Sequence, residues 1–169
     1  MNRTAIALLS LVLVACGGPA AGPAPDSFTE ADRAAILETL RLTASTDGRV
    51  MNECEELTTP QFLPAELGGS VGTAILFAIG GGPTMATCYG DGPDLHLFMR
   101  ADSGWREIYS ARGRMLIILP TSTSEVRDIA DGGPGFSFPV WTWNGTRFAP
   151  ANRDITDAEL SSMNATYLP

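Results

Sequence analysis

The sequence predicts a single, mainly β domain with an N-terminal helix, an α+β arrangement built as an antiparallel meander, a small sandwich or a partial propeller. Three observations support this fold class. Apolar runs of strand length recur between residues 71 and 149, and glycine-rich turns separate them. A helical pattern near residues 30–43 precedes these runs, and a shorter one near 157–163 follows them. The folded part, residues 26–169, has a normal length for one domain.

The first helix is expected near residues 30–43. Two pairs have the spacing of a capping box, Ser27 with Glu30 and Thr29 with Asp32. In such a box each side chain satisfies a backbone N–H group at the start of the helix. Apolar residues between 34 and 42 recur at helical spacing and form a broad apolar face. The stretch 44–70 is expected to be irregular, because prolines and a Gly-Gly pair interrupt it.

From residue 71 onward the pattern indicates strands. The run 94–100 alternates, so its odd-numbered and even-numbered side chains are expected on opposite faces of a sheet. Asn144-Gly145 lies between two apolar runs and is the strongest short hairpin signal in the chain. The short helix near 157–163 begins with a second capping-box spacing. The expected strands are 71–79, 84–89, 94–100, 105–111, 114–120, 135–143 and 146–150.

The N-terminus has the pattern of a secretory signal over residues 1–15. Arg3 precedes an apolar run at 5–14, which would cover only about half of a ~30 Å hydrocarbon core. The residues LVAC at 13–16 resemble the lipobox of bacterial lipoproteins. That resemblance implies cleavage before Cys16 and acylation of its sulfur, which would anchor the protein in a lipid bilayer. The alternative is an ordinary signal peptide followed by an unrelated cysteine.

Residues 16–25 are expected to join the lipidated cysteine to the domain as a flexible tether. Glycine resists ordering and proline keeps a chain extended, so the sequence GGPAAGPAP at 17–25 predicts no fold of its own. Gly17 stands where an aspartate would signal retention in the inner membrane. The lipoprotein resemblance therefore implies the bacterial envelope, at the outer membrane and facing the periplasm, for a Gram-negative source.

The chain is acidic, with a formal net charge of -8. Removal of residues 1–15 takes away one positive charge, Arg3, and changes this value from -8 to -9. Such a surface repels nucleic acid and anionic lipid and favours basic partners. The alternative is that the charge only keeps a secreted domain soluble.

Two of the three cysteines, Cys54 and Cys88, remain after the lipobox cysteine is assigned. An even pair in an oxidising compartment predicts a disulfide. It would close a loop of roughly 35 residues and stabilise the domain by about 3–4 kcal/mol. Two buried free thiols or a metal pair are the alternatives, although two thiols and one histidine make a poor metal set. Neither a metal nor a cofactor is predicted.

Two stretches, CYGDGPDLHLFMRADSGWREI at 88–108 and GGPGFSFPVWTWNGTRF at 132–148, resemble poorly characterised secreted β-rich bacterial proteins. The resemblance covers roughly residues 70–149. In layout these proteins are similar to FG-GAP-like hairpins, and some periplasmic lysozyme inhibitors share a β-rich layout. The FG-GAP resemblance would imply a calcium loop, but residues 67–79 contain neither aspartate nor asparagine, so calcium binding is not carried over. Ser137 stands where many relatives have a cysteine.

Few residues suggest chemistry of their own. The single histidine, His96, is expected on a strand, either at the surface or partly buried. The paired tryptophans of 141–143 are expected in the core on at least one side, and either would anchor a partner if exposed. Catalysis is not expected from any of these residues. The residues proposed for binding are Asp91, Asp94, Asp128 and Asp131 in turns, with Trp141 and Trp143.

Two classes of function follow from the sequence. The first is a non-enzymatic envelope lipoprotein that binds a basic protein, and lysozyme-like or other cationic hydrolases that it would inhibit are the first candidates. The alternative is a domain that binds or hydrolyses cell-wall glycan, with turn carboxylates and aromatic residues at its site.

Overall fold

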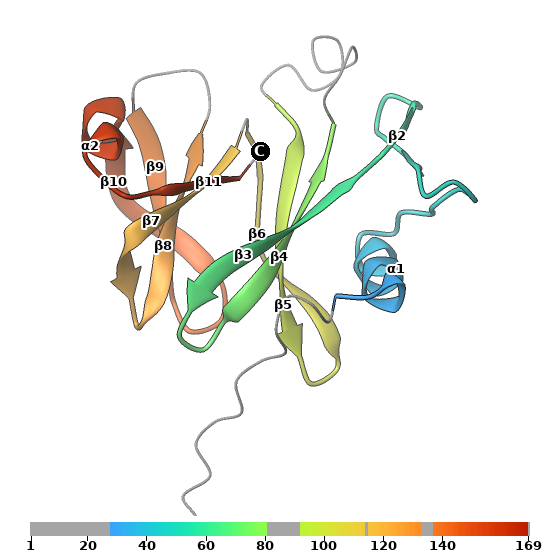
Figure 1. Ribbon diagram of the computed structural model, residues 1–169, viewed down its shortest axis with the longest axis horizontal. Coiled ribbons are helices and arrows are strands. Elements are labelled where there is room, and N and C mark those ends of the chain that lie inside the picture. Colours follow the sequence, from blue (N-terminus) through green and yellow to red (C-terminus); the bar gives the residue numbers. More distant parts are fainter. Residues whose placement is uncertain (1–27, 81–91, 114, 133–136, 169) are drawn as a thin grey trace, which may run out of the picture.

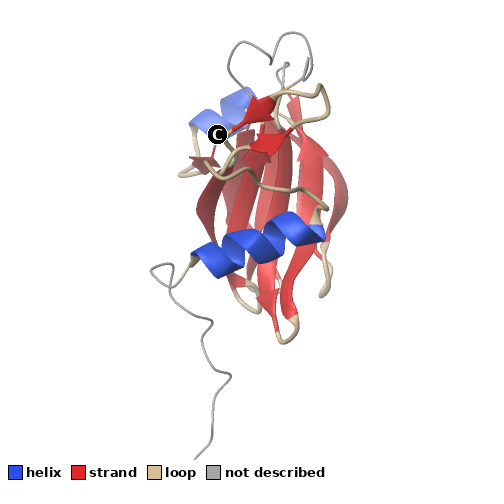
Figure 2. Cartoon of the chain, turned by 90° about the vertical axis from the view of Figure 1, so that its right-hand side faces the viewer, coloured by secondary structure: helices blue, strands red, loops and turns tan. Residues whose placement is uncertain are grey.

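The computed structural model describes residues 28–80, 92–113, 115–132 and 137–168 of the 169-residue chain. Two antiparallel sheets lie face to face, and a helix packs on the outer face of each sheet (Figures 1 and 2). The result is a four-layer sandwich in the order helix, sheet, sheet, helix. The predicted class, a mainly β domain with an N-terminal helix, is confirmed, and a sandwich is the form it takes.

The first sheet is a four-stranded meander in which each strand pairs with the next along the chain. Leu76 of β4 faces the second sheet, whereas Ile75 and Phe77 face the helix α1. This burial on both faces explains why the sequence of β4 is continuously apolar rather than alternating. The strands of this sheet are β3 (Gln61–Gly68), β4 (Gly72–Ile79), β5 (Asp94–Ala101) and β6 (Gly104–Arg112).

The second sheet has five strands in the order β10-β9-β8-β7-β11. Four of them form a meander, and the fifth follows the short helix α2 (Asp157–Ser161) and pairs with β7. The hairpin predicted at Asn144-Gly145 is confirmed, because Phe148 of β10 lies opposite Trp143 of β9. The strands are β7 (Met115–Thr123), β8 (Val126–Gly132), β9 (Ser137–Trp143), β10 (Phe148–Thr156) and β11 (Thr166–Leu168).

The expectation of an irregular chain over 44–70 is wrong in part. β1 (Val50–Met51) and β2 (Leu57–Thr58) form a small hairpin, and β3 follows with eight residues. Pro64 lies within β3, which tolerates a residue without an N–H group because β3 is an edge strand of its sheet. β8 and β11 were not expected either, and the expected strand 84–89 lies outside the described residues.

The helix α1 (Glu30–Thr39) begins with the predicted capping box of Thr29 and Asp32. It ends four residues before the expected position because the chain forms a Schellman motif. Leu42 N–H donates to the Leu37 carbonyl at 2.8 Å, and Arg41 N–H donates to the Glu38 carbonyl at 2.9 Å. Arg41 therefore occupies the position where glycine is usual, with a φ of 57°. Helix α2 also has its predicted capping box.

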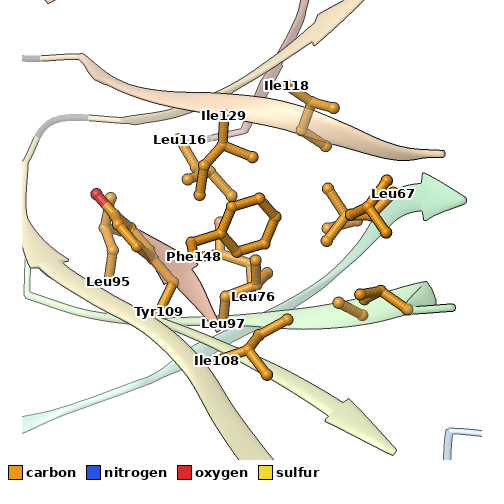
Figure 3. Packing of buried hydrophobic residues seen from close by; sticks show 14 of the residues in the cluster. Leu67, Leu76, Leu95, Leu97, Ile108, Tyr109, Leu116, Ile118, Ile129 and Phe148 are labelled. Atoms are coloured by element: carbon orange, nitrogen blue, oxygen red, sulfur yellow. The ribbon is translucent and has the colours of Figure 1, made fainter. Parts of the chain in front are cut away.

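The main core lies between the two sheets (Figure 3). Its residues come from both sheets and include Leu76, Leu97, Leu116, Ile129 and Phe148. Smaller apolar clusters attach α1 and α2 to the outer faces of the sheets. Within the described ranges, no helix is long and apolar enough to cross a membrane.

A bulge in β6 changes which side chains face this core. Leu97 pairs with Tyr109 and Phe98 pairs with Glu107, so Ile108 has no partner of its own in the register. The extra residue turns both Ile108 and Tyr109 toward the space between the sheets, where they are 1 % and 3 % exposed. The bulge thereby places the hydroxyl group of Tyr109 in the core.

The turns that join β3 to β4 and β7 to β8 touch each other across the sandwich. Gly69 has a φ of 52°, and a Cβ atom there would lie 2.8 Å from the backbone carbon of Glu125. Such a distance is shorter than any ordinary contact, so this close approach of two backbones requires glycine. By contrast, a Cβ atom at Gly72 would meet nothing within 4 Å.

Candidate binding surface

Two of the carboxylates predicted in exposed turns lie in strands and have partners there. Asp94 begins β5, and its carboxylate lies 3.0 Å from the Nε atom of Arg112. Asp128 lies in β8 with a side chain only 5 % exposed, and the hydroxyls of Thr121 and Thr123 donate to it at 2.7 and 2.8 Å. These bonds span the register shift in β7. Asp128 therefore stabilises the sheet, and its prediction as a loop contact for a partner is wrong.

Asp131 is also a strand residue, and the prediction of a loop position is wrong for it too. Its carboxylate accepts a hydrogen bond from the Tyr109 hydroxyl. Burial raises the pKa of the Asp131 carboxyl above its ordinary value, although this hydrogen bond opposes the shift. Burial and the neighbouring carboxylate raise the pKa of Tyr109 as well, so the phenol remains the donor. Asp128 and Asp131 lie on opposite faces of β8 and do not make the facing carboxylates of a glycosidase.

Both tryptophans proposed as anchors belong to the core. Trp143 is 4 % exposed and packs edge-on against Phe148, with 5.6 Å between the ring centroids. Trp141 is half-buried and contacts the Tyr109 ring at 5.3 Å. The expectation of a core role on at least one side is confirmed, whereas Trp143 is not exposed to any partner.

The cysteines are only partly described. Cys54 is exposed and disulfide-bonded. Its expected partner Cys88, the lipobox residue Cys16 and the turn residue Asp91 lie outside the described residues. The pairing of Cys54 with Cys88 and the acylation of Cys16 therefore stay predictions.

The β1–β2 hairpin is the feature that sequence reasoning missed. Its turn carries three exposed carboxylates, Glu53, Glu55 and Glu56. Met51 and Leu57 lie opposite each other in the hairpin and are 49 % and 44 % exposed, which makes them two of the most exposed large apolar side chains described. Figure 1 shows that the hairpin projects from the sandwich beyond the first sheet. The signal in the sequence was the acidic run ECEE at 53–56 between two apolar residues.

Local hydrogen bonds hold the turn of this hairpin in one shape. The buried Asn52 side chain accepts backbone N–H bonds from Cys54 and Glu56, each at 2.9 Å. The backbone of Asn52 bonds to Glu56 at 2.9 Å and to Glu55 at 3.1 Å. Asparagine favours turns because its side chain can replace a backbone partner in this way. With the disulfide at Cys54, these bonds present the carboxylates and the apolar pair in a fixed arrangement.

Arg112 joins the hairpin to the first sheet. Its guanidinium lies 2.7 Å from Glu53 and 3.0 Å from Asp94, so it links the turn to the start of β5. The hydrogen bonds that Arg112 donates to Asp94 and Glu53 raise the pKa of Arg112 further above its ordinary value. This junction is exposed, so its contribution is to position the hairpin more than to stabilise the fold.

The remaining polar clusters are small. His96 lies in a strand, as predicted, and is partly buried, which is one of the two expected positions. Its Nδ1 atom lies 2.5 Å from Glu107. In the part of the chain that the structure describes, no group of three or more histidine, cysteine, aspartate or glutamate residues is placed to hold a metal ion.

The fold and this surface define the class of molecule as a helix-covered β-sandwich that presents a rigid acidic hairpin with an apolar pair. Comparison with protein-family models, curated proteins and solved structures gave no match.

Proposed function

We propose that this protein is an envelope lipoprotein, anchored through Cys16, whose domain binds a basic protein. The observation that carries the proposal is the β1–β2 hairpin, whose turn carries Glu53, Glu55 and Glu56 next to an exposed apolar pair. Opposite charge speeds the encounter with a cationic surface and selects among partners. The apolar pair adds the desolvated contact that a specific interface needs at its centre.

The rigidity of the hairpin supports a binding role. A loop that is ordered before binding loses less conformational entropy when a partner docks. The Asn52 bonds and the disulfide of Cys54 provide this order in the free protein. Loops and turns held on a rigid sheet commonly carry recognition. Cationic hydrolases of the cell wall, with lysozyme-like enzymes first among them, have the required charge, and the acidic net charge of -8 favours the same class of partner.

The test uses residues 16–169 with Cys16→Ser, which removes the acylation site, against a panel of lysozymes and other cationic hydrolases. We expect retention or inhibition of at least one of them at low salt, with binding that weakens as the salt concentration rises. If none is retained or inhibited even at low salt, the inhibitor proposal should be abandoned.

A matched pair of variants locates the surface. The double change Glu55→Gln and Glu56→Gln should weaken binding by about 10-fold or more. The double change Asp102→Asn and Glu125→Gln removes the same charge from turns of the sandwich away from the hairpin. If both double variants weaken binding equally, net charge and not the hairpin is responsible.

A further inference from the structure

A second surface is a groove between α1 and the residues that follow it. Its volume is about 670 Å³, which falls in the range of about 300–1,000 Å³ typical of small-ligand sites. Its apolar lining is formed by Ala34, Leu37, Leu42, Pro60 and Phe62.

Most charges at the rim of the groove lie beside a charge of opposite sign, although the buried Arg33 Nε atom has no hydrogen-bond partner within the described residues. Arg33 Nε lies 3.1 Å from the Glu30 carboxylate, and its guanidinium lies over the Phe62 ring at 4.9 Å. The Asp47 carboxylate lies 2.8 Å from Arg49. The charges of these four side chains therefore balance one another, and none of them needs an ion from a ligand.

Glu38 and Arg41 differ from the others. Both are exposed at the rim, and the side chain of neither makes a hydrogen bond or salt bridge to a residue within the described ranges. Arg41 also holds the left-handed position of the Schellman motif with a φ of 57°, which a residue with a side chain rarely adopts. Glycine at this position would relieve the backbone, and the guanidinium makes no contact that offsets the strain.

We propose that the groove binds a short apolar peptide through both of its charged termini. The free carboxylate would meet the Arg41 guanidinium, whose planar fork matches a carboxylate in two parallel hydrogen bonds. The ammonium group would lie toward Glu38, and apolar side chains would cover Leu42 and Phe62. One unpaired cation and one unpaired anion beside an apolar floor fit a zwitterion, whereas a polyanion would be repelled by the carboxylates at the rim. This site uses other residues than the acidic hairpin, so the proposal stands apart from the proposed function.

The test titrates the protein of residues 16–169 with Cys16→Ser, without detergent, with tetra-alanine and tetra-leucine that have free termini. The same peptides with amidated C-termini and with acetylated N-termini serve as probes of each charge. We expect the free peptides to bind and the amidated peptides to bind about 10- to 100-fold more weakly. The acetylated peptides should lose less affinity than the amidated ones. Absence of binding by both free peptides, or equal binding of acids and amides, overturns the proposal.

The variant Arg41→Gly separates binding from folding. It should raise the midpoint of thermal unfolding by about 2–4 °C, because glycine adopts the left-handed backbone without strain. It should also weaken the binding of the free peptides about 10- to 100-fold. The control Arg147→Ala removes an exposed arginine from the β9–β10 turn and should change neither value. Unchanged peptide affinity in Arg41→Gly would show that the groove does not use this guanidinium.

Discussion

Replacement of Asp32 by alanine should destabilise the domain more than any other change in the first turn of α1. The Asp32 carboxylate is 9 % exposed and accepts bonds from the Thr29 N–H and hydroxyl, both at 2.8 Å. It also accepts from Arg100 at 2.7 Å and from the Trp105 indole N–H at 3.0 Å. One carboxylate thus caps the helix and fastens it to β5 and β6.

The magnitude follows from these partners. Loss of the bond that Asp32 accepts from the Thr29 N–H costs about 1 kcal/mol, and an indole N–H left without an acceptor costs about 1–3 kcal/mol. Arg100 is half-exposed, so water replaces its partner at little cost. We expect Asp32→Ala to lower the free energy of unfolding by about 2–4 kcal/mol, which corresponds to a fall of roughly 4–16 °C in the thermal midpoint.

The pH dependence gives a second check. Burial alone would raise the pKa of Asp32, but the hydrogen bonds from Thr29, Trp105 and Arg100 outweigh it and hold the pKa well below its ordinary value. A carboxylate with a lowered pKa stabilises the fold above about pH 5, and this contribution is lost as the pH falls below about 4. The difference between the wild type and Asp32→Asn should therefore shrink on acidification.

Urea unfolding followed by circular dichroism between pH 3 and pH 7 measures both effects. Glu30→Ala is the matched control, since Glu30 lies in the same turn with a side chain 90 % exposed and should cost less than about 0.5 kcal/mol. Equal losses for the two alanine variants, or a difference from Asp32→Asn that does not change with pH, would refute the reasoning.

Three further predictions concern the anchor, the disulfide and the turns. Cys16→Ser should leave unprocessed precursor without lipid label, and normal labelling of this variant would end the lipoprotein proposal. Mass mapping without reductant should find Cys54 linked to Cys88, and reduction should lower the free energy of unfolding by about 3–4 kcal/mol; a Cys88 thiol free to alkylate would contradict the pairing. Gly69→Ala should cost about 1–3 kcal/mol more than Gly72→Ala in chemical unfolding, because both have positive φ but a Cβ at Gly69 meets backbone; equal costs would show that the turn contact yields.

The sequence was most informative where one local pattern decides the structure. Capping boxes at Thr29 and Thr156 and the turn at Asn144-Gly145 depend on residues within a few positions of each other, and all three are present as predicted. The end of α1 was misplaced because the Schellman position holds Arg41, and sequence rules look for glycine there.

The roles of the acidic residues proposed for binding were harder to predict because they depend on distant contacts. Asp128 and Asp131 lie beside turn-like sequence, yet a neighbouring strand supplies hydroxyls to the first and the other sheet supplies Tyr109 to the second. The strand β3 was missed because Pro64 argues against a strand unless the strand is known to be at an edge, and edge position is a property of the whole sheet.

The irregular edge strands of the two sheets limit how this protein can bind other proteins. Pro64 interrupts β3, the register of β10 shifts after Pro150, β6 carries the bulge at Ile108, and β11 has three residues. None of these four described edges offers a long, regular row of backbone groups for another strand to join. Association by strand addition is therefore disfavoured, and recognition must depend on side chains. Partner choice in such a protein can change through single substitutions while the fold stays the same.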